Sequence, residues 1–445
     1  MINRHSYESV FRDHPILPVG QDPLATANSA ARAEATPPTG QWPRLGFACH
    51  WEANPEQTWS GSASNLRAAL GQITETADIG VRVPRLSRVA LKALHTRYYG
   101  GRLTTTWACS GLTDRYMRRC LHRELSRRRA LGECDAAIVI EDLAALPVPF
   151  FTYYDSSWDL LIAATQSAHV FASLRAISPS TLARRRARQI AVYEQANGVI
   201  AFSRWHARNL IEQSGISPEK VHVALPGIKG YLDDTGDPGR NERRLIRPVP
   251  HREGPRRRLL FVGRQHQWYD FYRKGGDLAV AALAILRRDY DPRVTLTIVG
   301  VDRWPMPGSP PDGVSLLGAL PAHEVRALYD SHDLFVMPSR FEPFGLVFAE
   351  AIASGLPCVA RNACAMPEIV TPGLSGALVT SDDEYELAAT IAASLTDDAL
   401  YENCASRAPA FAAYFSWERA ARDMVQVIYG TLNGLTPTEV ANGKR

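Results

Sequence analysis

Residues 334–351 read LFVMPSRFEPFGLVFAEA, and this stretch decides the fold. Four apolar residues predict a buried strand over 334–337, and the apolar run from Leu346 predicts a helix. A short loop ending at Gly345 separates the two. A helix that follows a parallel strand presents its free N–H groups and the positive end of its dipole at the strand's carboxyl end. The stretch therefore predicts an anion site at the edge of an α/β sheet.

Two carboxylates belong to this stretch. Glu342 lies in the loop before the helix, and Glu350 lies about one and a half turns inside the helix. An isolated glutamate at a helix start is adequately explained by the helix dipole. Glu350, however, lies among Val347, Phe348 and Ile352, so its carboxylate needs a partner or a ligand. The pair fits a diphosphate with a polyol on each side.

A second group of charges follows the predicted strand 259–262. Gly263-Arg264 comes directly after it, and Arg273-Lys274-Gly275-Gly276 opens the next helix. Cations near one strand end can clamp a diphosphate and stabilise its charge as it leaves. Basic loop residues are often no more than solvated surface. The helix start at Gly345 favours the phosphate interpretation.

Strands and helices alternate along most of the chain, which predicts an α/β protein with two Rossmann-like, doubly wound parallel sheets. The predicted strands are 45–49, 136–140, 149–153, 199–202, 259–262, 294–299, 314–317, 334–337 and 358–360. The predicted helices are 65–70, 277–286, 323–329, 346–354 and 417–429.

The domain organisation follows from this alternation and from a segment that interrupts it. Residues 233–257 are rich in proline, glycine and arginine without an apolar period, which predicts a linker. The predicted parts are a disordered tail 1–43, an N-terminal domain 44–232, the linker 233–257, a C-terminal domain 258–415, a helix 416–434 that packs back on the structure, and a tail 435–445.

Composition places the chain among soluble globular proteins, with 445 residues, 45% of them hydrophobic, and a net charge of +4. The first half is basic and the second mildly acidic. The seven cysteines are scattered and form no C-x-x-C pair, which argues against a disulfide framework and against a zinc site. No apolar stretch approaches the ~18 residues that cross a bilayer. We therefore expect a cytoplasmic protein.

The stretch from Phe261 to Val370 resembles the C-terminal domain of retaining glycosyltransferases of family 4, which have the GT-B architecture. The matching segments are Gly263-Arg264, Lys274-Gly275-Gly276, 334–339, the Glu342…Glu350 pair, 353–357 and 367–370. The N-terminal half agrees more loosely, through 59–61, 201–203, 220–223 and 226–228. The resemblance covers roughly residues 44–430 and implies two Rossmann-like domains facing across a cleft.

The resemblance implies roles for particular residues. Arg264 and Lys274 correspond to the pair that contacts the donor diphosphate, Glu350 to the carboxylate that binds the ribose, and Glu342 to the one beside the transferred sugar. The implied donor-binding set is Gly61, Gly263, Arg273, Phe344, Gly345, Leu346, Val347 and Glu350.

Two departures from the family pattern affect the site. The family often has a histidine near the sugar where this chain has Asp155. Asp155 either contacts the sugar or supports charge at the anomeric carbon, or it caps the following helix. The gap between Arg264 and Lys274 carries an aromatic insert, residues 268–272, so Arg273 is a candidate to share the diphosphate role.

Two further segments carry alternative interpretations. Asp289-Tyr290-Asp291 imitates the Asp-x-Asp metal motif of the other large glycosyltransferase fold, but it precedes a strand and so lies at the wrong end of the sheet. We expect no metal and no other cofactor. The basic run Arg115–Arg129, with Arg184–Arg188 as an extension, is either a solvated amphipathic helix or a contact for anionic lipid. Nucleic acid is not expected, because no binding module accompanies it.

The sequence thus predicts a retaining, metal-independent glycosyltransferase that moves a sugar from a UDP-, GDP- or ADP-linked donor to an acceptor hydroxyl. The acceptor is expected to be a glycan or a lipid-linked molecule in glycan, envelope polysaccharide or glycolipid synthesis, with peripheral contact at the inner face of a membrane as an option. The alternatives are a phosphorylase-type relative on the same fold and a non-catalytic protein that binds nucleotide sugars.

Overall fold

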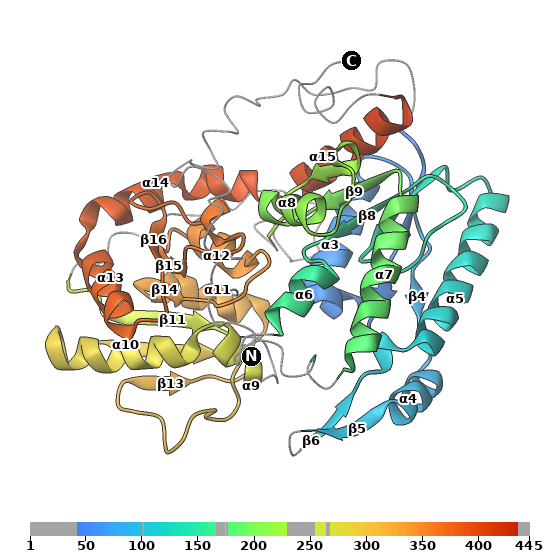
Figure 1. Ribbon diagram of the computed structural model, residues 1–445. Helices are drawn as coiled ribbons and strands as arrows, with labels where there is room; N and C mark the ends of the chain where they lie inside the picture. The colour runs from blue at the N-terminus through green and yellow to red at the C-terminus, as the bar shows by residue number, and fades with distance from the viewer. Residues whose placement is uncertain are drawn as a thin grey trace. The chain divides into compact units, whose positions relative to one another are not determined.

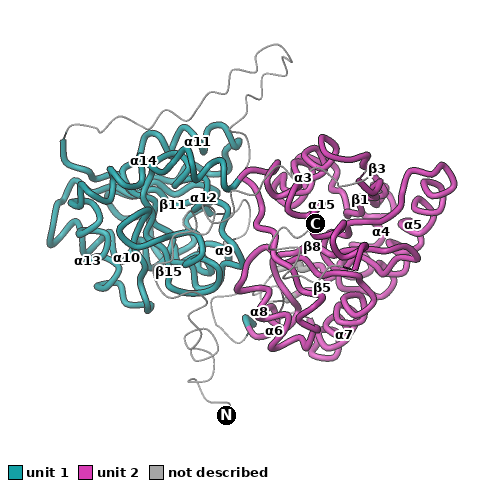
Figure 2. The backbone as a smooth tube through the Cα atoms, turned by 90° about the horizontal axis from the view of Figure 1, so that it is seen from above, with its two compact units in different colours: residues 1–30, 164–172, 230–415 teal, residues 31–163, 173–229, 416–445 magenta. Residues whose placement is uncertain are grey.

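The computed structural model describes residues 42–434 except 100–101, 166–173, 175–176, 229–253 and 264–267. The chain forms two compact units (Figure 2). Among the described residues, unit 1 comprises chiefly 254–415, and unit 2 comprises 42–163, 177–228 and 416–434. Each unit contains its own six-stranded sheet (Figure 1).

Unit 2 is built around a parallel sheet with the strand order β10-β9-β8-β7-β1-β3. Its strands are β1 (Leu45–Ala48), β2 (His50–Trp51), β3 (Thr76–Asp78), β4 (Val81–Arg82), β5 (Thr96–Tyr99), β6 (Arg102–Thr105), β7 (Ala136–Ile140), β8 (Phe150–Tyr154), β9 (Gly198–Ala201) and β10 (Val221–Val223). Its helices are η1 (Pro55–Gly61), α3 (Ser62–Gly71), α4 (Arg85–Leu94), η2 (Trp107–Cys109), α5 (Gly111–Ala130), α6 (Trp158–Ala164), α7 (Pro179–Gln195), α8 (Arg204–Glu212), η4 (Pro218–Lys220) and α15 (Trp417–Leu432).

The apolar core on one face of this sheet explains why these helices pack there. Met117, Leu121 and Leu125 recur along α5 at helical spacing and are buried against alternate residues of the central strands, such as Val139. Val192 of α7 belongs to the same cluster. Burying this surface is the main favourable term that holds α5 and α7 on the sheet.

Unit 1 contains a second parallel sheet, with the order β13-β12-β11-β14-β15-β16. Its strands are β11 (Arg258–Val262), β12 (Thr295–Val299), β13 (Val314–Leu316), β14 (Leu334–Met337), β15 (Cys358–Arg361) and β16 (Gly376–Val379). Its helices are α9 (Trp268–Arg273), α10 (Gly276–Asp289), α11 (Ala322–Ser331), α12 (Leu346–Ala353), η5 (Met366–Glu368), α13 (Glu384–Thr396) and α14 (Asp398–Tyr414).

Each sheet has a point at which the direction of strand addition reverses. In unit 1 the chain adds β12 and β13 on one side of β11 and then returns to place β14 on the other side. In unit 2 the reversal lies between β1 and β7. Ligands of open α/β sheets bind at the carboxyl ends of the strands at such a reversal. The loops after β11, β14, β1 and β7 are therefore where a site is expected.

The predicted strands and helices agree with the observed ones to within a few residues, including the predicted C-terminal helix, which is α15. The aromatic insert 268–272, for which no secondary structure was predicted, lies in α9. No prediction was made for β2, β3, β4, α4, β5, β6, α7, β16, α13 or α14. Most of the predicted linker and both predicted tails lie outside the described residues. No helix in the described part of the chain combines the length and hydropathy needed to cross a bilayer.

Helix α15 follows unit 1 in the sequence but belongs to unit 2. Phe415 is fully buried against Phe411 in unit 1. The next residue, Ser416, caps α15 by accepting a hydrogen bond from the Arg419 N–H. Gly227 lies so close to this helix start that a Cβ at its position would be 2.4 Å from the backbone nitrogen of Trp417. The absence of a side chain at Gly227 thus permits α15 to dock.

We predict that Gly227→Ala lowers the free energy of unfolding of unit 2 by about 1–3 kcal/mol, because backbone atoms must shift to accommodate the methyl group. The matched control is Gly71→Ala at the end of α3, where a Cβ meets nothing within 4 Å and where alanine is the better helix former by about 0.5 kcal/mol. Denaturant unfolding of both variants measures the difference. Equal stability of the two variants would contradict the close approach.

Candidate functional site

The candidate site of unit 1 depends on the packing of two loops at the reversal point. Gly275 has φ 75° and caps α10 in a left-handed conformation. A Cβ at this position would lie 2.4 Å from the carbonyl oxygen of Pro338, in the loop after β14. Glycine is therefore required here both for its conformation and for the close approach. The contact brings the turn after α9 against the loop that carries Glu342.

Three buried charged side chains meet at this contact. Lys274, Arg273 and Glu342 are each at least nine-tenths buried. The Lys274 Nζ lies 3.3 Å from the Glu342 Oε2, and the nearest Arg273 nitrogen lies 3.7 Å from it. Among the described residues, no donor makes a hydrogen bond to Glu342 Oε2 in good geometry. A buried carboxylate oxygen in this state can accept a hydrogen bond from a ligand hydroxyl.

Arg273 is engaged more fully than Lys274. Its Nε donates to Asp270 at 2.8 Å, and its Nη1 donates to the carbonyl oxygen of Phe341. The guanidinium thus holds α9 to the loop after β14. This engagement favours a structural role for Arg273 over the shared diphosphate role expected from the sequence.

Arg340, which sequence analysis did not single out, joins the same two loops. Its backbone N–H donates to the carbonyl oxygen of Arg273 at 2.8 Å, and its guanidinium pairs with Asp277 at 2.7 Å. Its Nη1 also donates to the carbonyl oxygen of Tyr272 at 2.6 Å. The sequence places Arg340 in the loop after β14, but it does not indicate these contacts, because Tyr272, Arg273 and Asp277 lie more than 60 residues earlier.

The start of α12 has the geometry of an anion site. Gly345 is its N-cap with φ 92°, and no side chain caps the helix. Leu346 and Val347 open the helix and are half-buried, so their N–H groups lie at its free, positively polarised end. Phe344 is 3% exposed and its ring packs against Phe415. Only the backbone of Phe344 is therefore available to a ligand.

Glu350 has the partner that its apolar surroundings demanded. Its Oε2 accepts a hydrogen bond of 3.1 Å from the hydroxyl of Tyr329, which is 3% exposed and lies in α11. The Glu350 side chain itself is half-buried. The sequence carried no signal for Tyr329, because the contact spans 21 residues and two helices.

Two residues that were expected to bind the sugar donor, Gly263 and Arg264, follow β11 in the sequence. Gly263 follows β11, and its N–H donates to the carbonyl oxygen of Val299 at 2.9 Å. Arg264 lies outside the described residues. Cys364, after β15, has φ 52°. Burial raises the pKa of its thiol to about 12, so it is a neutral group beside Glu342 and not a thiolate nucleophile.

In unit 2, the loop after β1 adopts a rare conformation before α3. Trp59, Ser60 and Gly61 are consecutive residues with positive φ, which is unfavourable for the two residues that are not glycine. The Trp59 ring packs on Phe202 with centroids 4.8 Å apart and on Tyr154 at 5.8 Å. These contacts attach the Gly61 loop to the end of β8.

Asp155 lies directly after β8, at the same edge. Its Oδ1 accepts a hydrogen bond of 3.0 Å from the Ser156 hydroxyl. The following helix α6 is capped by Ser157, whose Oγ accepts from the Leu160 N–H at 3.2 Å. Ser157 thus fills the capping role that was the alternative for Asp155. His206 supports this end of β8, because its Nδ1 lies 3.1 Å from the carbonyl oxygen of Tyr154 and donates to it.

Glu141 is a candidate that sequence analysis missed. It directly follows β7, at the reversal point of unit 2, and has φ 62°. Its side chain is exposed. Left-handed non-glycine residues are concentrated at functional sites. The available signal was the position of a carboxylate immediately after a buried strand.

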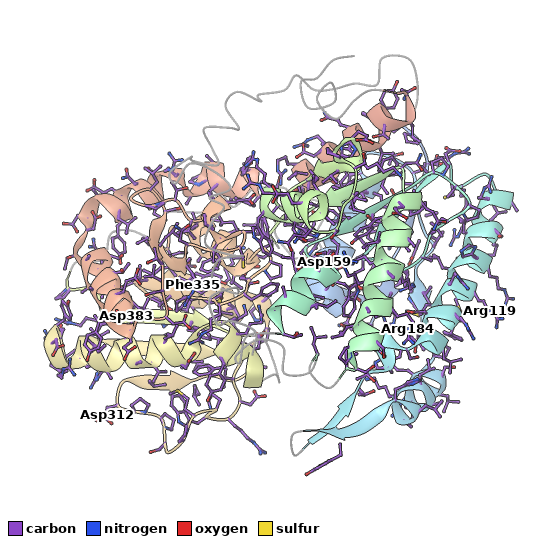
Figure 3. The ribbon with its side chains drawn as sticks, viewed as in Figure 1. Arg119, Asp159, Arg184, Asp312, Phe335 and Asp383 are labelled. Carbon is purple, nitrogen blue, oxygen red and sulfur yellow. The ribbon has the colours of Figure 1, made fainter. Side chains whose placement is uncertain are left out.

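The arginines of α5 and α7 divide into two sets. Arg119 on α5 and Arg184 on α7 are exposed and are labelled in Figure 3. Arg185, by contrast, is 8% exposed and pairs with Asp114 at 2.7 Å. The other paired arginines are Arg186 with Asp159, Arg188 with Asp114, and Arg127 and Arg128 with Glu124. Buried Arg185 therefore does not extend the basic surface, and the ion pairs of Arg186 and Arg188 join segments of unit 2.

The carboxylates of the Asp-x-Asp segment are also engaged. Asp289 pairs with Arg288, and Asp291 pairs with Arg257 and Arg293. Within the described residues, no group of three histidines, cysteines or carboxylates is arranged to hold a metal ion.

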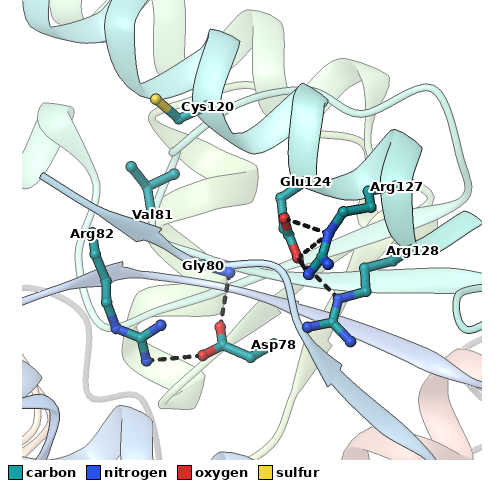
Figure 4. A pocket seen from close by; sticks show the side chains of 8 residues that line it. All are labelled: Asp78, Gly80, Val81, Arg82, Cys120, Glu124, Arg127 and Arg128. Carbon is teal, nitrogen blue, oxygen red and sulfur yellow. Dashed lines mark hydrogen bonds and ion pairs between the residues drawn. The ribbon is translucent and has the colours of Figure 1, made fainter.

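A pocket of about 390 Å³ lies on unit 2 between the turn before β4 and helix α5 (Figure 4). Its charged walls neutralise one another, since Arg82 pairs with Asp78 at 3.1 Å and Arg127 pairs with Glu124 at 2.6 Å. None of the predicted site residues lines it.

Comparisons with solved structures identify the architecture. Sucrose-phosphate synthase from Thermosynechococcus elongatus superposes with a TM-score of 0.60 at 19% identity, over 87% of this chain and 99% of that one. WaaG, a glycosyltransferase involved in lipopolysaccharide biosynthesis, superposes with a TM-score of 0.55 at 15% identity, over 87% of this chain and all of that one. The fold is GT-B.

Sequence comparisons concern mainly unit 1. Residues 256–397 match the family model described as Glycosyl transferases group 1. A D-inositol 3-phosphate glycosyltransferase of Corynebacterium aurimucosum is 30% identical over 61% of this chain and 66% of that protein. The glycogen synthase of Mycobacterium tuberculosis is 35% identical over 41% of this chain and 44% of that enzyme. The chain thus spans less than two thirds of the length of these curated relatives.

Two buried histidines should make the stability of unit 2 depend on pH. Burial lowers the pKa of His206 to about 3 and that of His222 to about 4, from the ordinary 6.5. Between those values and 6.5 the unfolded chain binds protons that the folded chain does not. We therefore predict that the free energy of unfolding of unit 2 falls as the pH drops from 7 towards 5, with a slope of up to about 1.4 kcal/mol per pH unit for each histidine.

Urea unfolding of wild type, His206→Gln and His222→Gln across this pH range measures the slope. Each variant is expected to show a shallower pH dependence than wild type, whatever its stability at neutral pH. Parallel pH dependences in all three proteins would contradict the assignment.

Proposed function

We propose that the protein is a retaining glycosyltransferase that uses a nucleotide-diphosphate sugar. The observation that carries the proposal is the junction of Lys274, Glu342 and the uncapped start of α12 at the reversal point of unit 1. It offers a cation and free N–H groups for a diphosphate beside an unsatisfied carboxylate oxygen for a sugar hydroxyl. The match of residues 256–397 to Glycosyl transferases group 1 supports it.

The proposed chemistry exchanges one C–O bond for another. The bond from the anomeric carbon to the donor phosphate breaks, the acceptor hydroxyl attacks the same face, and its proton passes to the departing phosphate. Lys274, Arg264 and the α12 start stabilise the negative charge that develops on the diphosphate, in place of a metal ion. Glu350 binds the ribose, and Glu342 orients the transferred sugar.

Unit 2 is proposed to serve the acceptor. Gly61 and Asp155 lie at the same edge of its sheet, joined by the aromatic packing of Trp59. Asp155 would hydrogen-bond the sugar or support positive charge at the anomeric carbon. The acceptor is proposed to be a glycan or a lipid-linked molecule, and the names of the curated relatives add D-inositol 3-phosphate to the compounds to be tested.

We propose a cytoplasmic enzyme of glycan, envelope polysaccharide or glycolipid synthesis with peripheral contact to an anionic membrane. The sequence associates this contact with Arg115–Arg129, in which the exposed arginines are Arg115, Arg118, Arg119, Arg123, Arg127 and Arg129.

A thermal-shift panel of UDP, GDP and ADP tests the donor site. We predict that one of them stabilises the wild type, by about 2.7 kcal/mol at ~100 times its dissociation constant. Glu350→Ala should lose this stabilisation, whereas the control Glu402→Ala, at an exposed position of α14, should keep it. If no nucleotide changes the melting temperature of the wild type, the proposed transferase activity is contradicted.

A second prediction concerns the chemical step. With the matching nucleotide sugar, Lys274→Met is expected to lower kcat by about 10²-fold or more, because a buried cation no longer stabilises the leaving diphosphate. Arg288→Met is the control, since Arg288 is exposed and pairs with the adjacent Asp289.

The same reaction mixtures discriminate the rival functions. NMR of the anomeric proton reports whether configuration is retained, and inversion would overturn the proposed mechanism. Formation of a sugar phosphate on adding inorganic phosphate would instead identify a phosphorylase.

A further inference from the structure

The described residues between β4 and α5, 84–99 and 102–106, form an excursion from unit 2 that contains α4 and the antiparallel strands β5 and β6 (Figure 1). The helix and the two strands form one piece. The Thr96 hydroxyl donates to the carbonyl oxygen of Lys92, and the Thr106 N–H donates to the carbonyl oxygen of His95 at 3.1 Å. The excursion is attached to the unit through Leu91, which belongs to the core, and through the stacking of Lys92 on Trp107.

Helix α4 is amphipathic, but its apolar stripe faces away from the core. The stripe follows the i, i+3, i+4, i+7, i+8 spacing of one helical face and consists of Leu86, Val89, Ala90, Ala93 and Leu94. All five residues are exposed, Leu86 to 86% and Leu94 to 71%. A globular protein normally turns such a stripe inward. The orientation of α4 therefore leaves an apolar face that needs another surface.

Two large apolar side chains in the segments that follow α4 in the sequence are also exposed. Tyr98 in β5 is 74% exposed, and Leu112 at the start of α5 is 52% exposed. Large apolar side chains are exposed elsewhere in the described residues, but they are dispersed over both units. Their concentration between residues 86 and 112 distinguishes this surface from the scattered exposure that is normal for proteins.

The charge of the same stretch has one sign. Between Asp78 and Asp114 the sequence contains no carboxylate, and its cationic residues are Arg82, Arg85, Arg88, Lys92, Arg97 and Arg102. Arg85 and Lys92 lie two turns apart on α4 and so share one flank of the apolar stripe. The exposed arginines Arg118 and Arg119 of α5 follow in the sequence.

This combination selects one kind of partner. Nucleic acid would use the cations but would leave the aliphatic stripe in water. A bilayer with anionic headgroups uses both features, because apolar side chains enter the interface while flanking cations meet lipid phosphates. We infer that helix α4 of this excursion is a membrane-docking surface that binds anionic lipid bilayers through Leu86, Val89 and Leu94 and the cations beside them. The inference places the contact on α4 instead of the run Arg115–Arg129 of α5, and it does not depend on sugar transfer.

Flotation with lipid vesicles, without nucleotide or sugar, tests the inference on the full chain. The protein is expected to float with vesicles of phosphatidylcholine containing about one third phosphatidylglycerol, and not with phosphatidylcholine alone. Leu86→Gln/Val89→Gln/Leu94→Gln should weaken binding by about tenfold or more, since glutamine preserves helix propensity but removes the apolar stripe. The control Leu317→Gln/Leu432→Gln, which alters exposed leucines elsewhere, should bind like wild type.

Two further variants separate the contributions. Arg85→Gln/Arg88→Gln, which leaves Lys92 on Trp107, should weaken binding severalfold or more and reduce its dependence on salt. Leu86→Trp should strengthen binding, because tryptophan favours the membrane interface. Circular dichroism and thermal unfolding confirm that each variant is folded.

The inference is overturned if the wild type fails to bind the anionic vesicles or if the triple glutamine variant of the stripe binds them equally well. It is also overturned if light scattering shows a dimer that this variant abolishes while vesicle binding is absent. In that case the face joins two copies of the chain.

Discussion

The contact between Gly275 and the Pro338 carbonyl is the constraint on which the arrangement of unit 1 depends. Because the two backbones meet without a side chain between them, the turn after α9 and the loop after β14 act as one body, and Arg340 fastens them. The desolvation of Lys274 and Glu342 follows from the same packing. Taking these charges out of water costs free energy that their mutual attraction only partly offsets. The packing of the two loops therefore fixes the positions of both charges.

Much of this arrangement was predicted from residues 334–351. The strand, the glycine at the end of the loop and the helix are each determined by neighbouring residues, so their sequence patterns are sufficient to predict them. The helix start, the loop position of Glu342 and the need of Glu350 for a partner all follow from spacing and hydropathy. The partner itself, Tyr329, does not, since it depends on how α11 packs against α12. The ion pair of Arg273 with Asp270 could not be predicted either. An arginine before a glycine turn has the same sequence pattern whether it binds a phosphate or a carboxylate of the protein.

Unit 2 was less predictable because its decisive features are conformational. Nothing in the composition of the loop after β1 indicates that Trp59 and Ser60 are left-handed, as the aromatic packing on Phe202 and Tyr154 fixes that conformation. Glu141 is similar, as its position after β7 becomes significant only once the strand order is known. Helix α4 was not predicted, although its apolar residues have helical spacing, and only the tertiary structure reveals that its apolar face points to solvent.

The chain passes from unit 1 to unit 2 between Phe415 and Ser416, and this connection affects how the protein folds during its synthesis. Unit 2 consists of an early segment and a late helix, with the whole of residues 254–415 synthesised between them. While the ribosome makes unit 1, the surface of α3 that will receive α15 has no cover, so the early segment cannot reach its native state during translation. Synthesis of α15, and not emergence of the first domain, allows unit 2 to complete its folding. An N-terminal fragment that stops before residue 416 would therefore resemble this nascent intermediate, with an apolar surface open to aggregation.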